Sequence, residues 1–301
     1  MIQFRFATLF LKPAPFALAF ALVLSGCSSG SLLSGVLGGD ESSTVGAKAG
    51  KGGALAPDLS ESSDGAVAGI YNEGLAHLQA GSYKKANKTF AEVERKHPYS
   101  KWATKAILMQ AFSSYQANAY DDSINAGKRF IALHPGHKDT PYAYYLVAIS
   151  EYEQIADVRR DQSRTERAVE ALEEVARRFP DSQYAADAQK KAGEGRNQLA
   201  AKEMEVGRYY MKKGSYLAGI NRFKKVVTDY QTSNHTPEAL YRLAEGYMAL
   251  GVVSEAQTAA AVLGHNYPNS EWYKDAYTLV SSDGRAPQVN QKSWMARIFG
   301  V

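Results

Sequence analysis

Three stretches of the sequence share one pattern: HPYSKWATKA (97–106), FPDSQYAADA (179–188) and YPNSEWYKDA (267–276). Each begins with an aromatic residue or histidine followed by proline. A serine stands two places after the proline, and an aromatic residue and alanine come next. Proline stops a helix because it lacks an N–H, and serine caps the start of a following helix. The recurrence predicts joints between repeated helical units, with each serine as an N-cap, rather than a catalytic motif.

The residues between these joints follow a helix-turn-helix frame of about 34 residues. Small residues such as Gly74 and Gly207 recur where two helices must approach closely, and Phe90 and Phe223 stand where a large side chain fills the remaining space. Alternating strand patterns are missing. This is the tetratricopeptide (TPR) pattern, and five degenerate copies cover nearly all of residues 67–270. The predicted fold is therefore all-α, a TPR superhelix of about five repeats.

The repeats divide into two blocks. Residues 67–181 form the predicted N-terminal TPR block with repeats 1–3. Residues 182–281 begin with a stretch free of proline, which predicts a long helix, and continue with repeats 4 and 5 and a capping helix. Residues 282–301 are a polar tail that ends in KSWMARIFGV. Its apolar side chains either dock on a partner or a membrane, or belong to a frayed terminus.

The N-terminal part has the features of a secreted lipoprotein. In residues 1–26 a basic start precedes the apolar run 16–24, which is typical of a signal peptide and too short to span a bilayer. Leu-Ser-Gly-Cys resembles the bacterial lipobox, in which Cys27 becomes the lipidated first residue; a free cysteine after an ordinary leader is the alternative. The serine that follows indicates the outer membrane in this class. Residues 27–66, rich in Gly, Ser and Ala, predict a lipid-anchored flexible linker.

Composition and motifs argue against several other classes. The chain has 301 residues, one cysteine and a net charge of +4, so it has no internal disulfide and no global attraction to nucleic acid. It carries no phosphate-binding glycine loop and no nucleophile elbow. The HPGH motif (134–137) lacks neighbouring carboxylates, and the basic insertion RRDQSR (159–164) is typical of a solvated loop. We expect no enzyme, no cofactor and no metal site.

The first helices of TPR repeats line a concave groove, and the positions that face it differ between the two blocks. In the first three repeats they are Tyr71, Leu75, Leu108, Phe112, Tyr115, Tyr142, Tyr145 and Tyr152. This set predicts a slot for an extended, aromatic segment of a client, because exposed aromatic surface marks binding. The alternative is that these tyrosines pack between adjacent repeats. In repeats 4 and 5 the same positions include Arg208, Glu238 and Glu245, which predict a charged docking face.

Longer motifs resemble one family of TPR lipoproteins. They are LSGC (24–27), RDQSRTERA (160–168), FPDSQYAADA (179–188), LAAKEMEVGRYYMKKGSYLAGINRF (199–223), EALYRLAEGYMALGV (238–252) and LGHNYPNSEWY (263–273). Their order resembles the BamD family of the outer-membrane β-barrel assembly (BAM) complex, over about residues 67–280.

The resemblance implies a scaffold at the cell outer membrane that faces the periplasm. Its implied partners are the POTRA domains of BamA, other BAM lipoproteins and unfolded outer-membrane β-barrel proteins. Family members use an arginine in a hydrophobic-Asn-Arg motif to contact BamA, and the matching residues here are Ile220-Asn221-Arg222, which makes Arg222 a candidate interface residue. The alternative is a TPR lipoprotein for type IV pilus secretin assembly or envelope division.

Overall fold

The computed structural model describes residues 59–282 and 284–301, and this part of the chain contains twelve helices and no strands. The helices are α2 (Leu59–Gln79), α3 (Tyr83–Lys96), α4 (Lys101–Gln116), α5 (Tyr120–Leu133), α6 (Thr140–Tyr152), α7 (Ser163–Arg178), α8 (Ala185–Lys212), α9 (Tyr216–Asp229), α10 (Thr236–Ala249), α11 (Val253–Asn266), α12 (Glu271–Ser281) and α13 (Trp294–Phe299). The all-α prediction is confirmed. The predicted signal peptide, Cys27 and most of the linker lie outside the described residues.

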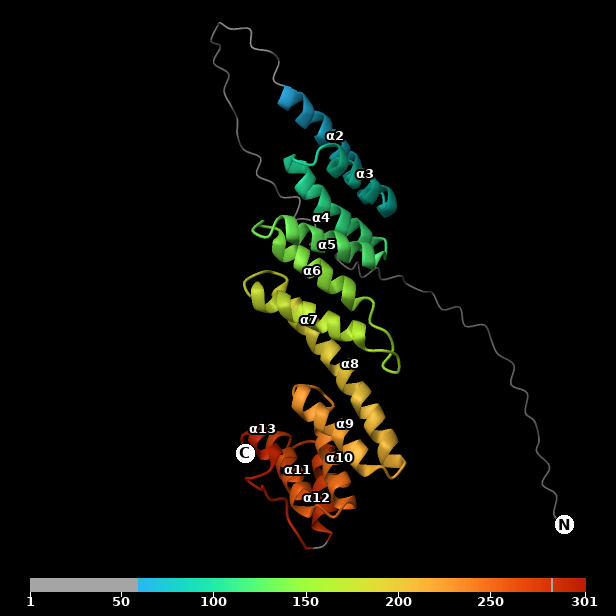
Figure 1. Ribbon diagram of the computed structural model, residues 1–301. Coiled ribbons are helices and arrows are strands. Elements are labelled where there is room, and N and C mark those ends of the chain that lie inside the picture. The colour runs from blue at the N-terminus through green and yellow to red at the C-terminus, as the bar shows by residue number, and fades with distance from the viewer. Residues whose placement is uncertain (1–58, 283) are drawn as a thin grey trace, which may run out of the picture. The chain divides into compact units, whose positions relative to one another are not determined.

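The helices form five antiparallel hairpins that stack in chain order (Figure 1). The hairpins are α2/α3, α4/α5, α6/α7, α8/α9 and α10/α11, and α12 packs on α10 and α11 as the capping helix. Helix α2 contacts α4, α4 contacts α6, and α6 contacts α8, so the first helices of repeats 1 to 4 lie together. This arrangement confirms the predicted TPR fold of five helix-turn-helix repeats.

The folded part begins earlier than the sequence predicted. Helix α2 starts at Leu59, whereas the linker was expected to reach residue 66. Serine and aspartate are as favourable near the start of a helix as in a linker, so composition alone could not place this boundary.

Small residues allow the two helices of a hairpin to approach, as predicted. A Cβ atom placed on Gly74 would lie 2.6 Å from the ring of Phe90, and one on Gly207 would lie 2.4 Å from the ring of Phe223. Both phenylalanines are completely buried. In repeat 2 the close approach is made between α5 and α6 of the next repeat. Gly127 stands where a phenylalanine was expected, and the side chain of Val147 from the next repeat fills the space above it.

The three joints bring aromatic residues of adjacent repeats together. The ring of Trp102 lies 5.1 Å from that of Tyr71, the Tyr184 ring 4.9 Å from that of Tyr145, and the Trp272 ring 5.4 Å from that of Tyr241, centre to centre. The aromatic residue after each joint therefore anchors its new helix on the preceding repeat, as the sequence predicted.

The joint serines do not all cap helices. Ser100 Oγ accepts a hydrogen bond from the N–H of Ala103, and Ser270 Oγ accepts one from Trp272. Ser182 departs from the prediction, because α8 begins only at Ala185 and the Ser182 hydroxyl is buried without a hydrogen-bond partner. The serine carbonyl accepts a backbone hydrogen bond from the residue three places on at all three joints, so the difference lies in the hydroxyl group of Ser182.

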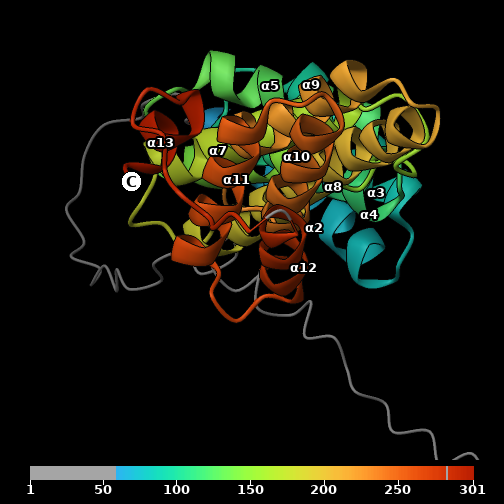
Figure 2. The same cartoon turned by 90° about the horizontal axis from the view of Figure 1, so that it is seen from below.

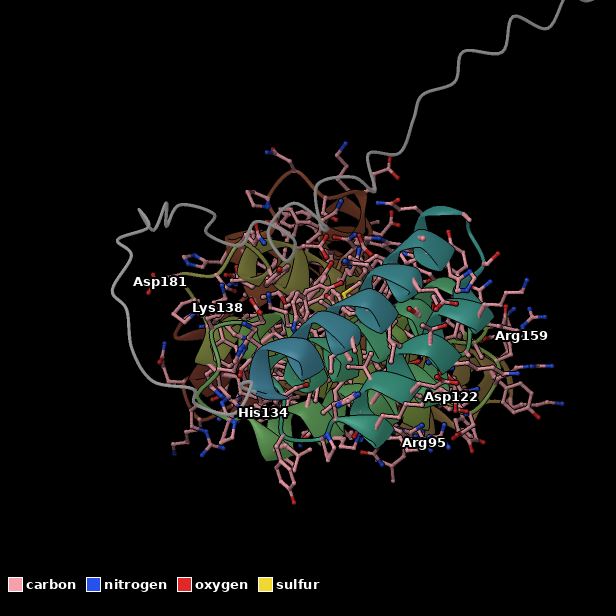
Figure 3. The ribbon with its side chains drawn as sticks, turned by 90° about the horizontal axis from the view of Figure 1, so that it is seen from above. Arg95, Asp122, His134, Lys138, Arg159 and Asp181 are labelled. Carbon is pink, nitrogen blue, oxygen red and sulfur yellow. The ribbon has the colours of Figure 1, made fainter. Side chains whose placement is uncertain are left out.

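The loops that connect the helices occupy two sides of the stack. Figure 3 shows Lys138 and Asp181, which lie in the joints after α5 and α7, on one side of the view. Asp122, in the first turn of α5, and Arg159, in the loop between α6 and α7, lie on the opposite side. In repeats 2 and 3 the joint that follows each hairpin and the turn within it therefore lie at opposite ends of the helices.

Helix α8 joins the two blocks. It runs unbroken for 28 residues, which corresponds to about 42 Å at 1.5 Å per residue. Its first half packs against α7 and its second half against α9. Glycines at 193 and 195 do not interrupt it, and a Cβ on Gly195 would lie 2.5 Å from a methyl group of Val169 in α7. The predicted long helix is confirmed, and Gly195 serves its close packing.

The C-terminal tail folds back on its own block, which corrects the expectation of a frayed or partner-seeking end. Helix α13 packs on α11 (Figure 2) and buries Met295 and Ala296. The Ser293 hydroxyl caps α13 and donates to Glu255 of α11 over 2.7 Å. The Trp294 indole N–H donates to the Tyr247 hydroxyl over 3.3 Å. The burial of these apolar side chains and the hydrogen bonds of Ser293 and Trp294 order this segment. The sequence of the tail alone does not show that it packs on α11.

Candidate functional site

Most of the predicted aromatic groove belongs to the core. Five of its eight residues, Tyr71, Leu108, Phe112, Tyr142 and Tyr145, are at most 7% exposed. The aromatic residues that follow the joints cover three of them: Trp102 lies on Tyr71, and Tyr184 lies on Tyr142 and Tyr145. The expectation that these five side chains line an open slot is therefore wrong. The packing alternative holds for them.

Three groove residues remain half-exposed: Leu75, Tyr115 and Tyr152. They come from α2, α4 and α6, the first helices of the three N-terminal repeats. The Tyr120 ring lies 5.8 Å from the Tyr115 ring and extends this aromatic surface. We refer to Leu75, Tyr115, Tyr120 and Tyr152 as the tyrosine face. It is narrower and more polar than the slot that the sequence predicted.

Carboxylates border the tyrosine face. The Tyr115 hydroxyl donates to Glu153 over 3.3 Å, and the Tyr152 hydroxyl donates to Glu194 of α8. Burial, and then the charge of Glu153, raises the pKa of Tyr115 to about 12. Burial and the hydrogen bond to Glu194 raise the pKa of Tyr152 to about 12. Both phenols therefore stay protonated at neutral pH and hold the two acids in place.

A second layer of this network lies on α8. The Tyr145 hydroxyl donates to Asp187 over 2.6 Å, and the Lys191 ammonium lies 3.4 Å from the same carboxylate. Lys191 also lies 5.4 Å from the centre of the Tyr152 ring. The face thus combines aromatic edges with carboxylate acceptors and one cation. Such groups suit an extended segment that offers aromatic side chains and unpaired backbone N–H donors.

Charged residues of α8 and α10 form a ladder in the C-terminal block. Arg208 Nη1 donates to both oxygens of Glu238, over 3.0 and 2.9 Å. Arg242 donates to Glu245 over 2.8 Å, and its guanidinium lies 5.2 Å from the Tyr241 ring centre. The charges that the sequence predicted here do lie together, but they largely neutralise one another.

Arg222 lies on the outer surface of α9. Its Nη1 donates to Glu203 Oε2 of α8 over 3.1 Å, and Lys225 Nζ lies 3.4 Å from the other oxygen of the same carboxylate. The Arg222 side chain is 44% exposed, whereas that of Glu203 is 13% exposed. Ile220 is buried and Asn221 is exposed, so one residue of the motif anchors the helix while two face solvent. Glu203 orients a guanidinium that retains free donors.

The basic insertion between α6 and α7 is tied to α8. Arg159 Nε lies 3.0 Å from Glu205, and the Gln198 amide donates to the carbonyl of Ala156 over 2.8 Å. The Arg159 side chain remains 82% exposed, consistent with the predicted solvated loop.

Two further features concern membranes and metals. Within residues 59–282 and 284–301, no helix combines the length and hydropathy that a membrane crossing needs. In the same part of the chain, His, Cys, Asp and Glu side chains form no group of three or more that could hold a metal ion.

Sequence reasoning missed one residue of chemical interest, Glu151 of α6. It is buried beneath α5 and α7, and its Oε2 accepts no hydrogen bond. The signal was a lone acid in the apolar run LVAISEY of α6. Its burial depends on α5 and α7, which flank α6, and therefore cannot be read from the sequence of α6.

The stacked hairpins and their two surfaces define a helical-repeat scaffold of the TPR class. The family model described as "Outer membrane lipoprotein" (YfiO) matches residues 63–263. The chain belongs to this family, and the resemblance to BamD proteins is confirmed.

Similar proteins named outer membrane protein assembly factor BamD occur in several bacteria. The Caulobacter vibrioides protein is 47% identical over 220 residues, which cover 73% of this chain and 72% of that protein. The Rickettsia prowazekii protein is 45% identical over 216 residues, covering 72% of this chain and 86% of that one. A Neisseria meningitidis serogroup A protein is 32% identical over 235 residues, covering 75% and 88%.

Proposed function

We propose that this chain is a lipid-anchored scaffold that faces the periplasm at the outer membrane and supports the assembly of β-barrel proteins without catalysing a reaction. Membership of the outer membrane lipoprotein family carries this proposal. Cys27 would hold the lipid, and more than one acyl chain would give stable anchoring. Residues 27–58 would connect the anchor to the helical stack. BamA and further lipoproteins of the BAM complex would be its protein partners.

Arg222 supports a contact with the POTRA domains of BamA. Glu203 holds its guanidinium at the surface of α9, where its remaining donors face solvent. An arginine presented in this way suits a carboxylate on the partner, because its donors match both carboxylate oxygens.

Reversing the charge at this position should weaken the complex. We expect Arg222→Glu to lower the affinity for BamA at least about tenfold, because a like-charge contact replaces an attraction. Co-purification and binding measurements with BamA would determine the loss, while circular dichroism checks that helix content is unchanged.

Lys225 provides a matched control, since it also pairs with Glu203 and lies one turn further along α9. Lys225→Glu makes the same charge change at the neighbouring position of the same helix face, so the comparison separates a specific role of position 222 from the total charge of this face. An equal loss from both variants would indicate a general charge effect, and full recovery of the complex with Arg222→Glu would remove Arg222 from the interface.

The tyrosine face supports a role in recognising unfolded barrel clients. An unfolded segment offers aromatic side chains and backbone N–H groups, and this face offers aromatic edges beside Glu153 and Glu194. A few such contacts yield weak binding, because association itself costs about 4 kcal/mol or more. Weak binding is appropriate for a client that must be passed on.

Truncating the two central tyrosines should weaken client binding. We expect Tyr115→Ala combined with Tyr152→Ala to reduce crosslinking to a peptide that ends in phenylalanine about tenfold, since each aromatic contact contributes about 0.5–1.5 kcal/mol. Tyr209→Ala is the control, because Tyr209 is 58% exposed and lies in the second half of α8, whereas Glu194, the acceptor of Tyr152, lies in the first half. Unchanged crosslinking in the double variant would refute this assignment, as would an equal decrease in the control.

A further inference from the structure

Helix α3, the second helix of repeat 1, carries an excess of positive charge. It has five basic and two acidic side chains. The second helices of the other repeats are closer to balance: α5 has two side chains of each sign, α7 has four of each, α9 has three basic and one acidic, and α11 has a single acid. Among these five helices α3 is therefore the most basic.

Three of the cations form a stripe along the exposed side of α3. Lys84, Lys88 and Arg95 are four and seven residues apart, a spacing that places their side chains on one side of a helix. All three are exposed, and none forms an ion pair or hydrogen bond with another described residue. The stripe runs for about 17 Å at 1.5 Å per residue. We refer to these three residues as the α3 stripe.

The two acids of α3 already have partners. Glu92 lies 3.0 Å from Lys96, one turn along the helix, and Glu94 lies 2.8 Å from Arg129 of α5. Helix α3 packs on α2 and α4, and the α3 stripe lies on the side that neither of them covers. The stripe therefore presents a net positive charge to whatever approaches this side of the scaffold.

This surface lies near the point where the folded part of the chain begins. The α2/α3 hairpin forms one end of the stack (Figure 1), and its helices are antiparallel, so Leu59 and Lys96 lie at the same end of the hairpin. Tyr99 follows in the next joint and is fully exposed. Under the proposed function, residues 28–58 connect this end to the lipid on Cys27. A Gly-rich chain of that length spans about 30 Å on average.

These features fit the surface of a membrane. Lysine and arginine side chains attract anionic lipid phosphates and need no pocket to do so, and exposed tyrosine favours the level of the lipid headgroups. The anchor would already hold this end of the stack within reach of the bilayer. A tether makes the second contact intramolecular, so a few cations suffice where they would bind weakly on their own.

We propose that the α3 stripe docks on the phosphate groups of anionic lipids in the membrane that holds the anchor. Lys84, Lys88 and Arg95 contact the phosphates, and Tyr99 lies among the headgroups. This contact orients the first hairpin on the membrane, which a flexible tether alone would not do. The inference rests on the lipid anchor of the proposed function and on no other part of it.

Fluorescence quenching on the lipidated full-length protein tests this contact. Cys27 is the only cysteine of the chain and would carry the lipid, so Ala91→Cys offers a single site for a fluorescent NBD label, one turn from both Lys88 and Arg95. Spin-labelled lipid quenches the label when α3 lies at the bilayer. We expect quenching at least about threefold stronger in vesicles that contain phosphatidylglycerol than in pure phosphatidylcholine, and a loss of this difference at high salt.

Replacing the three cations of the α3 stripe with glutamine should remove the difference between the two kinds of vesicle. Each cation near an anionic surface contributes about fivefold to binding, so the triple variant should weaken the contact about 100-fold. The matched control replaces three exposed lysines of α8 and α12 with glutamine and should retain the difference: Lys190, Lys212 and Lys274. Circular dichroism checks that both variants keep their helix content.

Flotation distinguishes a failure of this contact from a failure of the anchor. The lipidated protein and both triple variants should float with vesicles of either composition. Flotation with equal quenching in the two kinds of vesicle, or an equal loss in both triple variants, would overturn the docking alone. A label that responds to poly-glutamate but not to anionic lipid would assign the face to an acidic polypeptide instead. A protein that does not float with phosphatidylcholine would contradict the anchor, and the docking with it.

Discussion

Replacing Phe223 with alanine is expected to lower the free energy of unfolding by about 3–5 kcal/mol, because it leaves a cavity in the core of the C-terminal block. The Phe223 side chain is completely buried in a cluster with Met204 and Leu243. It fills the space that Gly207 leaves between α8 and α9. Urea unfolding followed by far-ultraviolet circular dichroism would measure the loss.

A double-mutant cycle with Gly207 tests the reason for this loss. Gly207→Ala alone should destabilise the protein, since its Cβ would lie 2.4 Å from the Phe223 ring. In the Phe223→Ala background the same change should instead stabilise by up to about 1 kcal/mol, because alanine favours helix over glycine and the ring is gone. Additive effects of the two changes would contradict the packing described for this hairpin.

The second large effect concerns the middle of α8. Ala201→Pro should cost about 3 kcal/mol or more, because proline removes a helical hydrogen bond and clashes with the preceding turn. Position 201 lies within the uninterrupted helix that both blocks share. Breaking that helix should also separate the unfolding of the two blocks, so that one cooperative transition becomes two.

Ala201→Gly is the matched control. Glycine costs about 1 kcal/mol in a helix and keeps the backbone hydrogen bond, so a single transition should persist. Differential scanning calorimetry would distinguish the two outcomes. A single transition in the proline variant would show that the blocks cooperate through contacts other than α8.

The sequence predicted the hairpins because their signals are local. Glycine opposite phenylalanine, and proline before serine and an aromatic residue, each report a contact between neighbouring helices. Surface exposure is different, because it depends on what covers a helix. Tyr142 and Tyr145 occupy groove positions in the frame, but Tyr184 from the next repeat lies on both.

The remaining differences have the same origin. Glu151 is buried because two other helices flank its own, and α13 is ordered because α11 offers it a surface. The sequence pattern within α6 or α13 does not show which other helices pack against it. Ser182 shows that the same motif does not guarantee a cap, since the Ser100 hydroxyl accepts from the N–H of Ala103 whereas the Ser182 hydroxyl has no hydrogen-bond partner.

The two proposed contact surfaces, the tyrosine face and Arg222, are both held by helix α8. Tyr152 donates a hydrogen bond to Glu194 and Arg222 donates one to Glu203, and both acids belong to α8. Their positions lie roughly 14 Å apart along its axis, at 1.5 Å per residue. Under the proposed function, α8 would therefore hold the partners bound at these two surfaces at a fixed distance from each other.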